Sequence, residues 1–199
     1  SSDDGLNAAG GNDGSSMNGR PGQNTFSSSD SDVSITITGG NIYVNASGDG
    51  LDSNGNLYIK GGNVIVDGPE DSGNGALDYD GTCEITGGTL IAAGMSGMAQ
   101  MPADTSSQAS VMITFDQTQS ENTLISLIQD NDLIIAYAPS KKFNNIVIST
   151  PSLTKDKIYS IQSGGTISGL ESKKAITEGT INNASTLGSF TLSDMATSI

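Results

Sequence analysis

The chain has 199 residues, enough for one large domain or two small ones. Its net charge of −14 argues against binding to nucleic acid or to an anionic membrane surface. It contains no His and a single Cys, which excludes an internal disulfide and disfavours a zinc enzyme or a Ser-His-Asp hydrolase. No apolar run is long enough to cross a bilayer, so we expect no membrane insertion.

Charge and glycine are unevenly distributed along the chain. Residues 1–110 hold 14 acids against 2 bases, a net of −12, whereas residues 111–199 hold 8 acids against 6 lysines, a net of −2. The first region also holds 21 of the 26 glycines. We therefore expect two regions, of which the first is rich in Asp and Gly. Solubility alone could explain such acidity, and a bound hard cation is the sharper interpretation.

The chain starts with Ser and shows no basic start and no apolar h-region. We expect any secretion signal to have been removed from it. The first motif is DDGLN from Asp3, which returns as GDGLD from Gly48 and as GNGALD from Gly73. The first two copies are 45 residues apart, so we expect that coil to carry an insertion. Residues 12–31, which are polar and rich in Gly and Ser, are its expected site as a surface loop.

Three further segments align without gaps: ITITGGNIYV at 35–44, LYIKGGNVIV at 57–66 and CEITGGTLIA at 83–92. Their Gly-Gly pairs begin at 39, 61 and 87, which gives periods of 22 and 26 residues. Periods of this size indicate a solenoid, and the alternation within each run indicates short strands. Glycine pairs suit tight corners that need a positive φ. We predict an all-β right-handed parallel β-helix over residues 1–110.

Alternation fixes which side chains of this solenoid point inward. Cys83 falls in an inward column, so we interpret it as a small apolar core residue rather than a reactive thiol. The predicted interior columns are Ile35, Leu57 and Cys83; Ile37, Ile59 and Ile85; Ile42, Val64 and Leu90; and Val44, Val66 and Ala92, joined by Leu6, Leu51 and Leu77 from the corner motifs.

The corner motifs should stack acidic side chains on the outside, coil over coil. Carboxylates about 5 Å apart repel by roughly 3 kcal/mol at an effective dielectric near 20. A cation would relieve this repulsion, and Asp and Asn oxygens with Gly-rich backbone carbonyls suit calcium. A solvated ladder that only caps turns is the alternative. One column is Asn7, Asp52 and Asp78 and a second is Asp4, Asp49 and Asn74; the predicted calcium ligands are Asp4, Asn7, Asp49, Asp52, Asp78 and Asp80.

From Val111 onward, short alternating runs separated by polar turns indicate antiparallel β-structure over residues 111–199. A solenoid end exposes strand edges and apolar core, so we expect this region to act as a cap or a packed side module. A separate ligand-binding module is the alternative.

Three outward side chains could contact a sugar: Tyr58, Lys60 and Tyr43. Tyr79, beside Asp78 and Asp80, could contribute as well, and simple packing at the corner is the alternative for it. Tyr43 stacks with Ile65 and Ile91 in an apolar column that either lies under the C-terminal region, which we prefer, or forms a shallow sugar platform. A polysaccharide lyase would need a base beside calcium, and the acidic half offers only Arg20 and Lys60. We therefore expect binding without catalysis.

Several of these motifs together resemble one known family. GDGLDSNGNLYIKGGNVIVDGP and GNGALDYDGTCEITGGTLIAAGMSGMAQMP, followed by YAPSKKF and STPSLTKDKIYSIQSGG, are similar to the clostridial cell-surface carbohydrate-binding β-helix family, over about residues 3–165. The resemblance implies a secreted, calcium-bearing solenoid that binds plant cell-wall polysaccharide, such as cellulose or acidic pectic chains. It also implies a monomer or a part of a larger multidomain surface protein. The third corner departs from the pattern, with Asn74 in place of an aspartate and an additional Ala76. A structural or adhesin element, in which calcium serves only stiffness, is the other class left open.

Overall fold

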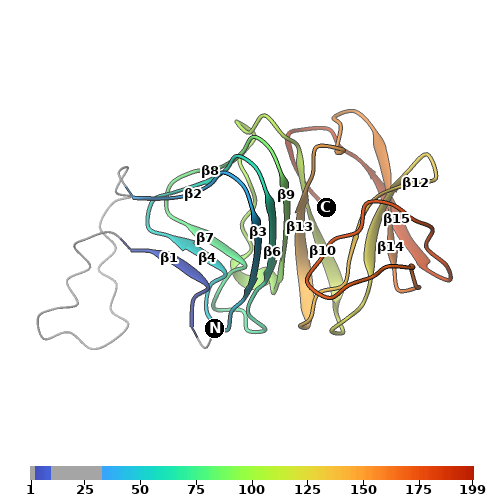
Figure 1. The fold of residues 1–199 in the computed structure, drawn as a ribbon, viewed down its shortest axis with the longest axis horizontal. Helices are drawn as coiled ribbons and strands as arrows, with labels where there is room; N and C mark the ends of the chain where they lie inside the picture. The colour runs from blue at the N-terminus through green and yellow to red at the C-terminus, as the bar shows by residue number, and fades with distance from the viewer. Residues whose placement is uncertain (1–2, 10–32) are drawn as a thin grey trace, which may run out of the picture.

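The computed structural model describes residues 3–9 and 33–199, so the expected loop at 12–31 lies outside the described residues. The described chain is all-β, as predicted, and its one helical element is a short 3-10 turn at Ser96–Met98. Figure 1 shows parallel strands on one side of a central sheet and antiparallel strands on the other. No helix among the described residues is long and apolar enough to cross a membrane.

The described residues between 6 and 94 form three parallel ladders, each of which takes one strand from each sequence repeat. Consecutive strands along the chain go to different ladders, and the fourth strand returns beside the first. The first ladder is β1 (Leu6–Ala8), β4 (Leu51–Ser53) and β7 (Leu77–Tyr79); the second is β2 (Ser34–Ile37), β5 (Asn56–Ile59) and β8 (Cys83–Ile85); the third is β3 (Asn41–Asn45), β6 (Asn63–Asp67) and β9 (Thr89–Gly94).

The register confirms the predicted inward columns, except that Leu6, on the first strand of its ladder, is 38% exposed and does not belong to the buried core. Leu57 pairs with Ile35 on one side and with Cys83 on the other, and Val64 pairs with Ile42 and with Leu90. Cys83 is fully buried, and burial raises the pKa of its thiol to about 12, in keeping with the predicted core role. One apolar cluster joins these columns: Ile37, Val44, Leu51, Leu57, Ile59, Val64, Val66, Leu77, Cys83, Ile85, Leu90 and Ala92 are among its buried members.

The Gly-Gly pairs make the corners between the second and third ladders, as expected. The second glycine of each pair has a positive φ, between 86° and 90°, at Gly40, Gly62 and Gly88. A β-carbon at Gly62 would lie 2.7 Å from backbone atoms of the preceding corner, whereas one at Gly40 would meet nothing within 4 Å. Glycine is therefore needed for its φ at each corner, and for close stacking only where another corner lies beneath.

This difference gives a matched pair of substitutions. Gly40→Ala should lower the free energy of unfolding by about 1–2 kcal/mol, the cost of a left-handed alanine. Gly62→Ala should cost about 1 kcal/mol more, because the added methyl also overlaps backbone that cannot rotate away. Urea unfolding of the two variants measures the difference directly. Equal losses would show that the corners do not stack as tightly as described.

The third ladder continues beyond the repeats into one larger sheet. β13 (Phe143–Ser149) pairs antiparallel with β9, followed by β10 (Ser110–Gln119) and β16 (Ala196–Ser198). A second sheet contains β12 (Asp132–Tyr137), β11 (Ile125–Gln129), β14 (Ile158–Ser163) and β15 (Ser185–Thr191), all antiparallel. The C-terminal region is thus antiparallel as predicted, except that β10 and β16 pair in parallel.

The larger sheet has an apolar core on each face. One face closes the cluster inside the parallel ladders, and the other packs against the second sheet. Ile65 and Ile91 belong to this second core, and Tyr43 packs against it. The preferred interpretation of the Tyr43 column, that it lies under the C-terminal region, is therefore confirmed.

The segment at 99–108 covers strand edges that the last repeat would otherwise expose. Ala103 and Gln108 donate backbone N–H groups to the carbonyls of Cys83 and Ile85 in β8. Gln100 accepts from the N–H of Tyr79 in β7 at 2.9 Å. These bonds satisfy the backbone groups at one end of two ladders, as a cap must do.

Candidate functional site

The acidic corners meet on the outer face of the first ladder. Asn7 pairs with Asp52, and Asp52 pairs with Asp78, so the predicted column is present rung by rung. The amide nitrogen of Asn7 donates to Asp52 Oδ2 at 2.6 Å and to Asp4 Oδ2 at 2.9 Å. Asn7 therefore holds two carboxylates together as a hydrogen-bond donor, rather than facing them with its oxygen.

The second predicted column holds for two rungs and is shifted at the third. Asp4 Oδ1 accepts from the Asp49 N–H at 2.9 Å, and Asp49 Oδ1 accepts from the Gly75 N–H at 2.6 Å. The residue beneath Asp49 is thus Gly75, not Asn74, because the additional Ala76 moves the third corner by one position. Asn74 instead donates to Asp71 Oδ1 at 3.1 Å. Asp4 and Asp49, two of the predicted calcium ligands, therefore each accept a hydrogen bond from a backbone N–H of the next corner.

Burial, followed by the charges of neighbouring aspartates, raises the pKa values of Asp49, Asp52 and Asp78 on this face. Burial, together with the charges of Asp4, Asp78, Asp49 and Asp80, raises the pKa of Asp52 to about 7. Burial first and neighbouring aspartates second also raise the pKa values of Asp49 and Asp78. Within the described ranges, the one ion pair joins Lys174 to Glu171, so no described base neutralises these acids.

This pKa shift predicts a pH dependence of stability in the absence of divalent metal. Between the ordinary value of 3.8 and about 7, the folded protein keeps a proton on Asp52 that the unfolded chain has lost. Stability from this group is therefore complete below pH 3.8 and is lost as the pH rises to 7. In EDTA, urea unfolding should show a larger loss between pH 5 and pH 8 for the wild type than for Asp52→Asn. Parallel pH curves for the two proteins would contradict the shift.

The carboxylates of this face affect one another's charge, but their side chains do not point toward a common metal position. In the part of the chain that the structure describes, no group of three or more His, Cys, Asp or Glu side chains is placed so that it could hold a metal ion. What the fold supplies is the backbone register of Asp52 above Asp78, with Asp80 close enough to affect both pKa values.

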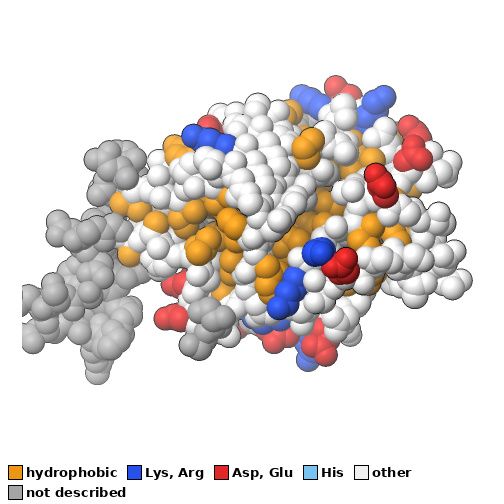
Figure 2. All heavy atoms as spheres, viewed as in Figure 1, with side chains coloured by type: hydrophobic (Ala, Val, Ile, Leu, Met, Phe, Trp, Pro, Cys, Tyr) orange, Lys and Arg blue, Asp and Glu red, His pale blue; other side chains and the backbone are white. Residues whose placement is uncertain are grey.

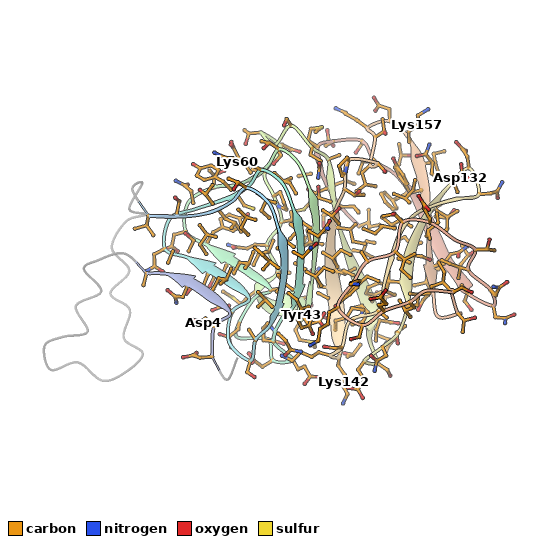
Figure 3. All side chains as sticks on the ribbon, in the orientation of Figure 1. Asp4, Tyr43, Lys60, Asp132, Lys142 and Lys157 are labelled. Atoms are coloured by element: carbon orange, nitrogen blue, oxygen red, sulfur yellow. The ribbon has the colours of Figure 1, made fainter. Side chains whose placement is uncertain are left out.

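The four predicted sugar contacts do not form one site. Tyr58 lies on the outer face of the second ladder with the Lys60 ammonium 5.5 Å from its ring centre, so these two are together. Tyr43 lies on the third ladder, and Figure 3 shows Lys60 and Tyr43 on different sides of the parallel part. Tyr79 lies on the first ladder, and its hydroxyl donates to the Met101 carbonyl at 2.7 Å, which fits the simpler prediction of corner packing.

A buried carboxylate that the sequence reasoning did not single out lies between the larger sheet and the second sheet. Asp67 is 1% exposed and accepts from the hydroxyls of Tyr43 and Tyr137, both at 2.9 Å. It also accepts from the Ser140 N–H at 3.0 Å and from the Ser140 hydroxyl at 2.6 Å. Burial and the charge of Asp67 raise the pKa of Tyr137 far above its usual range. The alternation that turns Ile65 outward also turns Asp67 outward, which was the available signal.

Comparisons with protein-family models, with curated proteins and with solved structures found no match for the chain.

Proposed function

We propose that the three parallel ladders are successive coils of a right-handed parallel β-helix. We further propose that the protein is a non-catalytic, calcium-dependent binder of plant cell-wall polysaccharide, cellulose or an acidic pectic chain, at a bacterial cell surface. Three ladders that share one strand order, with one strand of each repeat in each ladder, support the β-helix. The resemblance of the corner and Gly-Gly motifs to the clostridial family supports the ligand class.

The observation that carries the calcium proposal is the in-register pair of Asp52 and Asp78. Their pKa values are raised, so each carboxylate is held where its own negative charge is disfavoured. A divalent cation reverses this penalty, and carboxylate oxygens are the ligands that calcium prefers. Asp52, Asp78 and Asp80 would hold the ion after their side chains rotate toward a common point, with Asp4, Asn7 and Asp49 completing the acidic face.

The outer face of the second ladder is the best-supported sugar surface. Tyr58 offers an aromatic ring for stacking against a sugar, and Lys60 lies beside it. Thr36 and Glu84 pair with Tyr58 from the neighbouring strands, so hydrogen-bonding groups flank the ring. A calcium ion on the adjacent acidic face would let so negative a protein hold an acidic glycan.

Binding without catalysis is favoured by where the base lies. A lyase needs a base beside the calcium that neutralises the uronate. Within the described residues of the repeats, Lys60 is the basic side chain, and it belongs to the second ladder, whereas the acids belong to the first.

A structural role is the second candidate, and one observation favours it. Tyr43 and Tyr79, two of the four predicted sugar contacts, use their hydroxyls in bonds within the protein. With those side chains committed, calcium could stiffen a surface scaffold that binds no glycan.

Glycan retention with and without chelator tests the proposal. We expect cellulose or polygalacturonate beads to retain the protein in calcium and to release it in EDTA while its circular dichroism spectrum stays β-type. Tyr58→Ala should weaken retention, whereas Tyr79→Phe, which removes only a hydroxyl from a packed ring, should not. Absence of retention in calcium on both glycans would overturn the binding proposal and favour the scaffold. Unsaturated uronide absorbance in the supernatant would overturn the non-catalytic part.

A further inference from the structure

A pocket lined by both polar and apolar side chains lies beside β3, the edge strand of the larger sheet. It has a volume of about 370 Å³ and lies between β3 and the connection from β14 to β15. Figure 2 shows basic side chains beside hydrophobic ones in the part of this face where Figure 3 labels Tyr43. A pocket of this size is within the range that small ligands occupy.

One wall of the pocket is a ladder of hydrogen-bonding side chains on neighbouring strands. Asn41 on β3 pairs with Asn63 on β6, which pairs with Thr89 on β9. The Asn63 amide donates to Asn41 Oδ1 at 2.8 Å. This bond uses one donor and one acceptor, so Asn41 keeps its amide donors and Asn63 its oxygen for a ligand. Amides and hydroxyls at strand spacing suit neighbouring hydroxyls on a sugar ring.

The opposite wall supplies positive charge. Lys173 holds its ammonium 4.9 Å from the ring centre of Tyr43, and Lys174 also lines the pocket, although Glu171 pairs with it at 2.5 Å. None of the pocket-lining side chains is acidic. On a chain with a net charge of −14, a lysine-lined pocket without a lining acid selects for an anion.

The backbone conformation at Lys173 is unusual. Its φ of 68° is left-handed, a conformation that a non-glycine residue rarely adopts. Ile176, three residues on, is fixed by two backbone hydrogen bonds to Ala136 at 2.7 and 2.9 Å. Tyr43 is fixed in turn by its hydroxyl bonds to Asp67 and Ser140. The ring is therefore fixed by its hydroxyl bonds, and the turn that carries Lys173 is tied to β12 through Ile176.

We propose that this pocket binds one carboxylate-bearing sugar residue, without calcium, as a site separate from the acidic face. The Lys173 ammonium pairs with the carboxylate of the sugar. The hydroxyls of the sugar ring form hydrogen bonds with the side chains of Asn41, Asn63 and Thr89. The proposal does not depend on the calcium site, because the two sites share no residue.

A titration in EDTA tests it. The probes are a trimer of galacturonic acid and the same trimer as its neutral methyl ester, followed by NMR chemical shifts of the protein. We expect the acid to bind at least tenfold more tightly than the ester and to shift the pocket residues. Lys173→Asn, which removes the charge but tolerates a left-handed φ, should lower affinity for the acid at least tenfold and leave the ester unchanged. Lys157→Asn, an exposed lysine that Figure 3 places far from Tyr43, is the matched control and should change neither.

Asn63→Ala is a second test variant. Loss of its amide should lower the affinity for the acid trimer and for the ester trimer alike. Asp52→Asn should leave the titration unchanged, which separates this site from the calcium-dependent one. The proposal is overturned if the wild type binds neither trimer, if acid and ester bind equally, or if Lys173→Asn keeps the wild-type affinity while its melting temperature matches that of Lys157→Asn.

Discussion

Replacing Asp67 by alanine should lower the free energy of unfolding by about 3–5 kcal/mol, the largest single effect we expect in this protein. The carboxylate accepts four hydrogen bonds, from the hydroxyls of Tyr43 and Tyr137 and from the N–H and hydroxyl of Ser140. Tyr137 is 2% exposed, so its hydroxyl lies away from bulk water in the folded protein. Alanine leaves the Tyr137 hydroxyl and the Ser140 N–H without their acceptor, whereas the hydroxyls of Tyr43 and Ser140 can still bond to each other at 3.0 Å.

The size of the loss can be checked by urea unfolding with Asp67→Asn and Asp116→Ala as controls. Asparagine keeps the shape and one acceptor oxygen, so its loss should be smaller than that of alanine. Asp116 is an exposed aspartate on β10, and its removal should change stability by less than about 0.5 kcal/mol. A loss below about 1 kcal/mol for Asp67→Ala would contradict the assigned role of this carboxylate in joining the sheets.

The Asp52→Asn variant should be more stable than the wild type in EDTA and less stable in calcium. Asparagine removes one of several repelling charges but still accepts from the Asn7 amide, which explains the gain without metal. On the proposed site it also removes a charged calcium ligand. At a calcium concentration 100 times the dissociation constant, the wild type should gain about 2.7 kcal/mol, and a 100-fold weaker variant should gain only about 0.4 kcal/mol.

Thermal melts of wild type, Asp52→Asn and Asp116→Asn at pH 8, each with EDTA and with calcium, measure this reversal. Asp116→Asn changes the net charge equally but lies outside the acidic face, so it should keep the full calcium gain. If Asp52→Asn keeps the wild-type gain, Asp52 is not a ligand. If it is less stable than the wild type in EDTA as well, the repulsion inferred from its pKa is wrong.

The repeat made the parallel part of the fold predictable. Residues at equivalent positions of the Gly-Gly segments, such as Ile37, Ile59 and Ile85, do pair strand to strand, because period-two alternation leaves one register that buries every apolar side chain. The same alternation placed Asn7, Asp52 and Asp78 in one column. The corner with Ala76 could not be placed as well, since one additional residue there can be absorbed on either side of Asn74.

The contacts between the two regions were not predictable from periodicity. Alternation gave the outward direction of Tyr43 and suggested that it is covered, but not that it bonds to Asp67 and Ser140, which are 24 and 97 residues away. Tyr79 was a candidate sugar contact because it neighbours two aspartates. In the structure its hydroxyl donates a hydrogen bond to the Met101 carbonyl. Side chains on one face of a strand are fixed by local rules, whereas their partners depend on how distant segments pack.

The calcium proposal is tested most directly by a crystal structure of the full chain grown in calcium, with an anomalous-difference map. We expect a peak bound by carboxylate oxygens of Asp52 and Asp78 on the outer face of the first ladder. A map without a peak at saturating calcium, or with its peaks away from both aspartates, would contradict the proposal.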